Sequence, residues 1–222
     1  MTISILNMRL TLLAELPESQ TLFAEKFMLE GIQDLCRETA CYIEPITLTS
    51  IKDQSIYPMT ITTSNAEVIG FWQGKYDNAN MPPMSNRMMD LSDRQWETRS
   101  GTPNAAIYDG DVSVRFNVTP DTSGKAIQLE PIIMPSNIDA DVPPRIDKRH
   151  REAVKSYVKW KIYENPGQFF SADLALYYRQ DYERRRNKLK VEIAKDGAEV
   201  TARSRSFVYG DPSPPFDISL NE

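Results

Sequence analysis

Two amphipathic helices joined by a short break set the strongest limit on how this chain folds. Residues 142–194 place apolar side chains at helical spacing, and Asn165-Pro166-Gly167 interrupts the pattern. Proline and glycine end helices, and so short a connection makes the flanking helices antiparallel neighbours. Ser171 is a good N-cap for the second helix. Such a hairpin needs further elements to cover its apolar stripes.

Each helix of the hairpin has one apolar stripe. The first stripe contains Ile146, His150, Ala153, Val154, Tyr157 and Trp160, and the second contains Leu174, Tyr178, Tyr182, Leu189 and Ile193. A stripe with a period of 3.6 residues faces a core. The only histidine of the chain, His150, lies on the stripe. This position favours a packing residue over a catalytic one.

Two further helices are predicted near the N-terminus, at residues 4–15 and after an N-cap at Ser19. The second presents one apolar face, formed by Ala24, Met28, Ile32, Leu35, Cys36 and Thr39. Cys36 and Cys41 are the only cysteines, so the chain has no disulfide framework. We expect both to act as small hydrophobic residues in a protein made in a reducing cytosol.

The middle of the chain has the alternation of β-strands. Strands are predicted at residues 46–49 and 66–76, and Asp109-Gly110 is typical of a two-residue hairpin turn. After this turn Val112, Val114, Phe116 and Val118 alternate with polar residues, and Ile127, Leu129 and Ile133 continue the alternation. Residues 78–86 are predicted to form a surface loop and residues 90–94 a short helical turn.

These patterns predict an α+β fold. An N-terminal helix and the two long antiparallel C-terminal helices form a helical bundle, with an inserted antiparallel β-sheet or sandwich and an extended C-terminal tail. The predicted divisions are 1–42, 43–140, 141–196 and 197–222. The tail is rich in proline and includes Phe207, Tyr209 and Phe216. Such a segment cannot build a core, and its aromatic residues suggest ordering against a partner.

Composition and missing motifs argue against several classes of function. The formal net charge is -5, which argues against a free-standing DNA-binding protein. The sequence has no secretory signal, no apolar run long enough to cross a membrane, no phosphate-binding loop and no histidine cluster. We therefore expect a soluble protein without cofactor or metal.

Three local features leave other functions open. Exposed Trp72 and Trp96 would form the binding platform of a β-sandwich module. Such a module would bind glycans or belong to the tail structure of a virus particle. A hydrolase would need an acid pair from Glu97, Asp109 and Asp111. The basic run of Arg184, Arg185, Arg186 and Lys188 is either a solvated face balanced by Asp181, Glu183 and Glu192 or a contact surface. As a contact surface, it favours an acidic protein over DNA phosphates.

Several local patterns, taken in order over residues 27–194, resemble the head-to-tail connector (adaptor) proteins of short-tailed phages. The resemblance rests on residues 31–41, on Trp96 followed by Gly101-Thr102-Pro103, on Thr119-Pro120-Asp121, and on residues 141–144, 151–154, 165–167 and 174–178. The sequence departs from the family at the helix joint, where Asn165-Pro166-Gly167 replaces a Pro-Gly-Lys-Pro-Trp-like segment, and in the tail after Gly197.

The resemblance implies a non-enzymatic virion protein at the neck between head and tail, assembled in the host cytoplasm. It implies a homo-oligomeric, commonly dodecameric, ring that binds the portal protein, meets a tail nozzle or other tail protein, and continues the channel for double-stranded DNA. Protomer contacts are expected at surplus aromatic residues, namely Tyr157, Trp160, Tyr163, Phe169, Phe170 and Tyr177. Portal or partner contacts are expected at Arg184, Arg185, Arg186, Lys188, Phe207, Tyr209 and Phe216.

Overall fold

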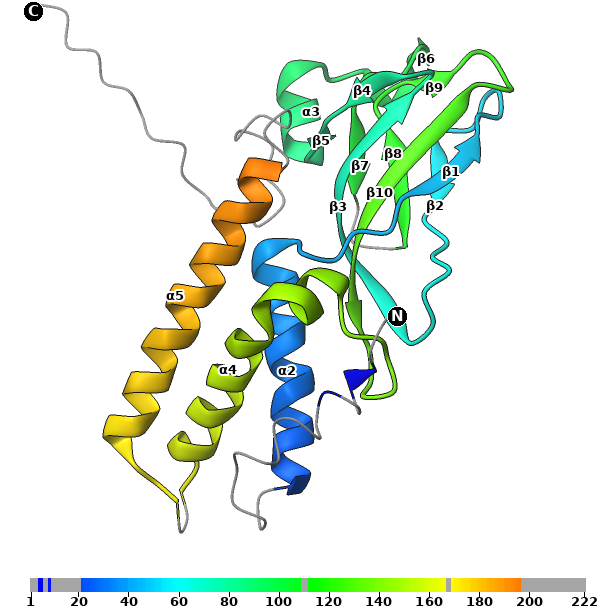
Figure 1. Ribbon diagram of the computed structural model, residues 1–222. Coiled ribbons are helices and arrows are strands. Elements are labelled where there is room, and N and C mark those ends of the chain that lie inside the picture. The colour runs from blue at the N-terminus through cyan, green and yellow to red at the C-terminus, as the bar shows by residue number, and fades with distance from the viewer. Residues whose placement is uncertain (1–3, 6–7, 9–20, 109–111, 167–168, 197–222) are drawn as a thin grey trace, which may run out of the picture.

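The computed structural model describes residues 4–5, 8, 21–108, 112–166 and 169–196, and all structural statements concern these residues. The molecule is elongated, with a layer of helices at one end and two packed sheets at the other (Figure 1). This arrangement confirms the predicted α+β fold with inserted antiparallel sheets. The four-part division of the chain stays a prediction. The predicted helix at 4–15 lies mostly outside the described residues.

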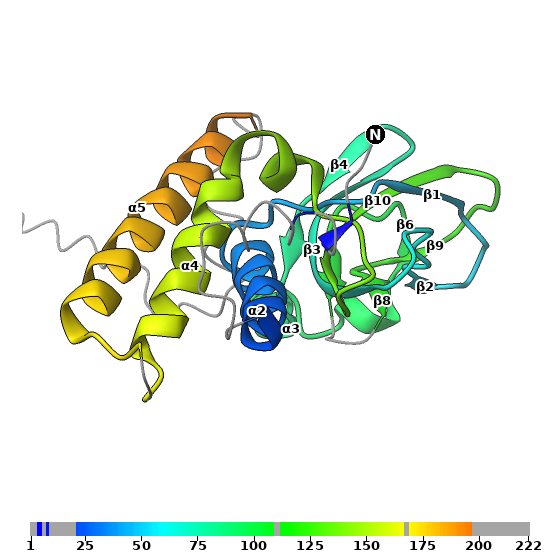
Figure 2. The same cartoon turned by 60° about the horizontal axis from the view of Figure 1, so that its bottom comes forward.

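The helical layer consists of α2 (Thr21–Thr39), α4 (Arg151–Glu164) and α5 (Ala172–Asp196). The views in Figures 1 and 2 agree that α4 lies between α2 and α5, and that α4 and α5 are antiparallel neighbours. Helical structure begins at Pro144, since proline is tolerated in the first turn of a helix, and passes through a π-helical turn at Ile146–His150 before α4. The joint at Asn165-Pro166 separates α4 from α5.

The core of the helical layer confirms the predicted stripe of α2. All six side chains of that stripe are buried: Ala24, Met28, Ile32, Leu35, Cys36 and Thr39. From the hairpin, His150, Val154, Tyr182 and Ile193 are buried as well. Trp72 and Ile132 of the sheet belong to the same cluster, so the helices pack directly on the β region.

The β region consists of two four-stranded sheets and one short strand pair. The first sheet has the order β1 (Ile46–Thr49), β10 (Ala126–Pro135), β3 (Ala66–Tyr76), β4 (Ala79–Met81), and the second has the order β2 (Ile56–Pro58), β8 (Ser113–Phe116), β7 (Ala106–Tyr108), β5 (Pro83–Met84). The extra pair joins β6 (Ser100–Gly101) to β9 (Thr119–Pro120). Both large sheets contribute to a second core, which makes the region a sandwich.

Strand β10 contributes to both cores. Ile127 and Leu129 point into the sandwich core, whereas Ile132 and Met134 join the helical core. The pairing of β10 with β3 shifts register after Glu130 and again after Ile132. Such shifts mark bulges, which bend a strand. The simple alternation predicted through Ile133 therefore does not continue along the strand.

The structure corrects several local predictions. Residues 78–86 contain β4 and β5 instead of a loop, because Asp77 and Asn78 both have positive φ (47° and 68°) and form a tight turn after β3. The turn predicted at 90–94 is the end of a helix, α3 (Asn86–Ser92), which Ser85 caps. Val112 is 58% exposed and not buried. The antiparallel pairing of β7 with β8 is as predicted, although Asp109-Gly110 lies outside the described residues.

Close packing of α2 on α4 generates a testable prediction at Gly31. A Cβ atom at this position would lie 2.9 Å from Cδ1 and 3.0 Å from Cγ of Tyr157. In a free helix, alanine is more favourable than glycine by about 1 kcal/mol. Here we expect Gly31→Ala to lower the free energy of unfolding by about 1 to 3 kcal/mol, because the helices must move apart. Urea denaturation measures the change.

A double-mutant cycle provides the control. In a Tyr157→Ala background the two ring contacts are absent and the contact to Cβ of residue 157 at 3.2 Å remains, so Gly31→Ala should cost much less there. An equal loss of stability in both backgrounds would contradict the packing argument.

Candidate assembly surface of the helical hairpin

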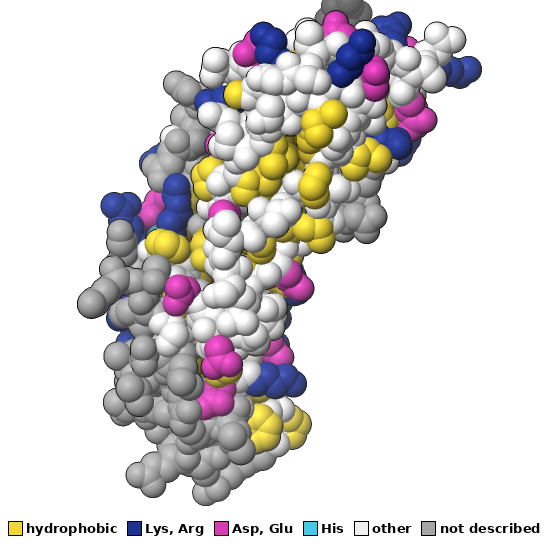
Figure 3. Space-filling model, turned by 90° about the vertical axis from the view of Figure 1, so that its right-hand side faces the viewer, with side chains coloured by type: hydrophobic (Ala, Val, Ile, Leu, Met, Phe, Trp, Pro, Cys, Tyr) yellow, Lys and Arg dark blue, Asp and Glu magenta, His cyan; other side chains and the backbone are white. Residues whose placement is uncertain are grey.

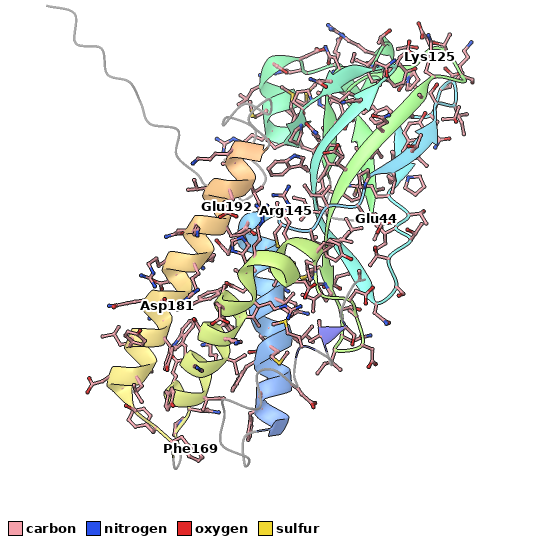
Figure 4. The ribbon with its side chains drawn as sticks, viewed as in Figure 1. Glu44, Lys125, Arg145, Phe169, Asp181 and Glu192 are labelled. Carbon is pink, nitrogen blue, oxygen red and sulfur yellow. The ribbon has the colours of Figure 1, made fainter. Side chains whose placement is uncertain are left out.

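The joint between α4 and α5 is held by local hydrogen bonds. The backbone N–H of Leu174 donates to Ser171 Oγ at 3.4 Å, which confirms Ser171 as the N-cap of α5. The backbone N–H of Ser171 donates in turn to the carbonyl of Tyr163 at 3.1 Å. Figure 4 places Phe169 at this end of the hairpin, called here the hairpin tip (residues 163–166 and 169–178). The tip is thus a fixed end of the helical layer.

The predicted contact aromatics fall into two groups. Tyr157, Trp160 and Phe169 are partly buried against the helical core. Tyr163 stacks on Tyr178, with ring centroids 5.7 Å apart. Phe170 and Tyr177 are 57% and 62% exposed. These two are therefore the predicted aromatic contacts whose rings are mainly in solvent, while the others also serve the fold of the protomer.

Sequence reasoning missed two aliphatic residues of the hairpin tip. Leu174 and Leu176 are 41% and 55% exposed. Leu174 was assigned to the inward stripe, but its position in the first turn of α5 leaves it at the edge of the core. The signal was present, because residues 174–178 are five consecutive apolar residues and one face of a helix cannot bury them all. Phe170, Leu174, Leu176 and Tyr177 together give the tip its exposed apolar character.

Cationic side chains lie over the rings beside the tip. Lys161 Nζ is 4.0 Å from the centroid of the Trp160 ring, and Lys159 Nζ is 5.4 Å from that of Tyr178. Lys161 also pairs with Glu164 at 2.8 Å. Cation–π contacts of this kind fix the orientation of rings. The aromatic surface is consequently ordered within the protomer.

Most of the basic run on α5 is already paired. Asp181 accepts hydrogen bonds from Arg184 at 2.5 Å and Arg185 at 2.7 Å. Arg186 lies 3.6 Å from Asp34 of α2. By contrast, Lys188 and Lys190 are exposed and have no ion pair within the described residues. The run thus separates into arginines that neutralise acids of the protomer and lysines that leave positive charge at the surface.

Polar contacts hold α5 on the other two helices. Asp181 accepts a hydrogen bond from Ser156 of α4 at 2.6 Å, and Tyr182 donates to Asp34 of α2. Burial, together with the Asp34 carboxylate, raises the pKa of Tyr182 far above its ordinary value. Figure 4 places Glu192 toward the other end of α5. There His150 Nε2 lies 2.9 Å from Glu192 Oε2. His150 is buried, and this contact gives its Nε2 atom a polar partner inside the core.

Where the structure describes them, the residues proposed for other functions are buried or engaged in ion pairs. Trp72 and Trp96 are 9% and 3% exposed, so the exposed aromatic platform predicted for glycan binding is wrong. Trp96 is covered by Met89 and Ile107 and donates to Asp90 at 2.9 Å. Glu97 pairs with Arg115 at 2.8 Å. The remaining candidates, Asp109, Asp111, Phe207, Tyr209 and Phe216, lie outside the described residues.

Within the described parts of the chain, no group of three or more His, Cys, Asp or Glu side chains is arranged to hold a metal ion. The helices in those parts are also too short or too polar to cross a membrane. What the described surface does offer is an ordered aromatic tip at one end of the hairpin and, farther along α5, the exposed Lys188 and Lys190.

The comparison with known families shows the family of the chain. The sequence matches the SU10 adaptor protein family over residues 1–206, and the chain therefore belongs to this family of phage adaptor proteins. The match confirms the resemblance deduced from the local patterns. The protein is a structural component of the phage virion with an adaptor role between head and tail, and the family implies no catalytic role. No curated protein matches the sequence.

Asp181 yields a prediction about stability and pH. Its carboxylate is mostly buried, which raises the pKa, but hydrogen bonds from Ser156, Arg185 and Arg184 outweigh this effect and hold the pKa below the ordinary 3.8. We expect Asp181→Asn to lower the free energy of unfolding by about 1 to 3 kcal/mol at neutral pH. Because the folded-state pKa is lowered, the difference persists above the ordinary value and disappears as pH falls through the folded-state pKa.

Urea denaturation between about pH 7 and pH 3 measures this difference. Glu183→Gln is the matched control, since Glu183 pairs with Arg179 in an exposed i,i+4 contact on the same helix. The control should change stability by less than about 0.5 kcal/mol. A penalty for Asp181→Asn that stays constant down to the lowest pH would refute the role of the ionised carboxylate.

Proposed function

We propose that copies of this adaptor pack head to tail into a closed ring between the portal and the tail. The ring is dodecameric, as the resemblance implies, and its lumen continues the channel for double-stranded DNA without sequence-specific contacts. The helical layer forms the wall of the ring, and the β sandwich faces outward or toward a tail nozzle or other tail protein. The observation that carries this proposal is the exposed apolar tip of the hairpin on a chain of the adaptor family.

A second exposed apolar surface supports head-to-tail packing. Ile51, in the connection between β1 and β2, and Ile56, the first residue of β2, are 54% and 45% exposed. Figure 3 shows hydrophobic side chains gathered over the sandwich on this side of the molecule, and a smaller group at the opposite end. A ring requires two different surfaces on each protomer, whereas a twofold dimer uses one surface twice. Apolar surfaces at both ends of one chain suit the ring.

The charges on α5 support a contact with an acidic surface of the portal. The predicted contact residues were Arg184, Arg185, Arg186 and Lys188. Since Asp181 and Asp34 engage the three arginines, the proposal assigns the main attraction to Lys188 and its neighbour Lys190. Their charges are not neutralised within the described protomer, and a few unpaired cations favour a protein contact over firm binding to passing DNA.

Leu176→Asp tests the role of the hairpin tip in ring assembly. The side chain is exposed in the protomer, so the change should leave folding intact, as circular dichroism can check. We expect the wild-type protein, alone or with portal, to form a high-mass ring, and the variant to shift to smaller species because a buried unpaired charge is costly. Mass photometry measures the distribution.

Leu91→Asp is the matched control, since Leu91 is a 79% exposed leucine on α3, away from the tip. It should assemble like the wild type. Normal assembly of Leu176→Asp would exclude the tip from the interface. A wild-type protein that remains monomeric both alone and with portal would refute the ring itself.

The C-terminal tail generates a separate prediction. We propose that residues 203–222 dock on the portal or on a neighbouring protomer by adding a strand to a sheet edge, with Phe207, Tyr209 and Phe216 as anchors. Deleting residues 203–222 should leave the protomer folded and weaken portal binding at least tenfold in a pull-down titration. Unchanged portal binding by the truncated protein would contradict docking on the portal.

A further inference from the structure

The two cysteines meet at the end of α2. Cys36 lies in the last turns of the helix and Cys41 just beyond it, and both are buried. Their sulfur atoms are 3.8 Å apart. The approach depends on Ala40, whose positive φ of 53° reverses the chain after the helix and turns Cys41 back toward Cys36. The backbone geometry at the end of α2 therefore brings the two sulfur atoms together.

We propose that Cys36 and Cys41 form a modification site, at which a hydroperoxide converts the two thiols into a reversible intramolecular disulfide. A disulfide bond is about 2.05 Å long, so the sulfur atoms must approach by about 1.8 Å. Both thiols are no more than 5% exposed. This burial admits a small oxidant such as hydrogen peroxide and disfavours a bulky one such as glutathione disulfide. The proposal goes beyond the adaptor role and does not depend on the ring.

The surroundings of the two sulfur atoms assign different roles to them. The Cys36 thiol can donate a hydrogen bond to a thiolate at Cys41, and this contact lowers the pKa of Cys41 despite its burial. Burial raises the pKa of Cys36. Cys41 is accordingly the thiol that reacts with the oxidant, and Cys36 is the resolving thiol.

The reaction proceeds in two balanced steps. The Cys41 thiolate attacks one peroxide oxygen, the O–O bond breaks, and the departing hydroxide takes up a proton to leave as water, which gives Cys41 sulfenic acid. The Cys36 sulfur then attacks the Cys41 sulfur, the S–O bond breaks, and the hydroxide leaves as water with the proton of the Cys36 thiol. The two cysteines lose two electrons in total, and hydrogen peroxide is reduced to two water molecules.

A disulfide between Cys36 and Cys41 would affect the segment that joins α2 to the sheet. The residue after Cys41 is Tyr42, whose carbonyl accepts a hydrogen bond from Ile133 of β10 at 2.9 Å. Glu44 donates its backbone N–H to Pro131 of the same strand at 3.2 Å. A disulfide would thus tie the last turn of α2 to the segment that attaches to β10. Oxidation would stiffen the joint between the helical layer and the sandwich.

Mass spectrometry of the full-length protein tests the proposal. After treatment with hydrogen peroxide we expect the intact mass to fall by two hydrogen atoms and to return after dithiothreitol. Trypsin cleaves after Arg37, which lies between the two cysteines, so the bond should appear as a linked pair of peptides. The oxidised protein should also melt at a higher temperature than the reduced protein.

Serine variants separate the two roles. Cys36→Ser should leave Cys41 as a sulfenic acid, seen as a gain of one oxygen atom in the intact mass, whereas Cys41→Ser should leave Cys36 largely unreacted. The proposal is overturned if the wild-type protein keeps two free thiols, gains oxygen without a linked peptide pair, or links its cysteines only between chains. These outcomes are read from the wild type alone, so they hold even if a serine variant fails to fold.

Discussion

The close contact of α2 with its neighbours holds the two halves of this adaptor together. On one side Gly31 lets α2 approach the ring of Tyr157 on α4, and on the other side Gln33 donates a hydrogen bond to the carbonyl of Pro135 at 2.9 Å. Trp72 and Ile132 extend the helical core into the sheet beneath. Because α4 is seated on α2, and α5 on both, the position of the hairpin tip depends on this one helix.

The attachment of α5 differs from that of α2. Ala175, Tyr182, Leu189 and Ile193 provide its buried apolar side chains. Asp181, Tyr182 and Glu192 provide polar contacts to α4, α2 and His150. Buried polar contacts demand specific geometry, so they fix the register of a helix better than apolar contacts do. The outer face of α5 is left to carry Leu176, Tyr177 and the unpaired lysines. One face of α5 is therefore held against the protomer, and its outer face remains accessible to partner proteins.

The helices were predictable because their signals are local. The 3.6-residue period of α2 identified its buried side chains except Phe27, and the break at Asn165-Pro166-Gly167 placed α4 against α5. Strand β3 was predicted with its observed bounds, since 66–76 is rich in β-branched and aromatic residues and ends at a turn. The β4 strand was missed although Asp77-Asn78 is a recognisable turn signal. The two-residue strands β5, β6 and β9 have no local signature and exist through pairing with distant residues.

The candidate surface was predictable only in part. Sequence identified the surplus aromatics and the basic run, but burial depends on which distant residues cover a side chain, so Trp96 was wrongly expected to be exposed and Leu176 was overlooked. The sequence also could not show that Asp34 of α2 engages Arg186. Electron microscopy of the purified protein mixed with its portal tests the central claim most directly. The account predicts closed rings stacked coaxially on the portal, with hairpin tips buried between protomers; isolated protomers, or rings whose tips are in solvent, would contradict it.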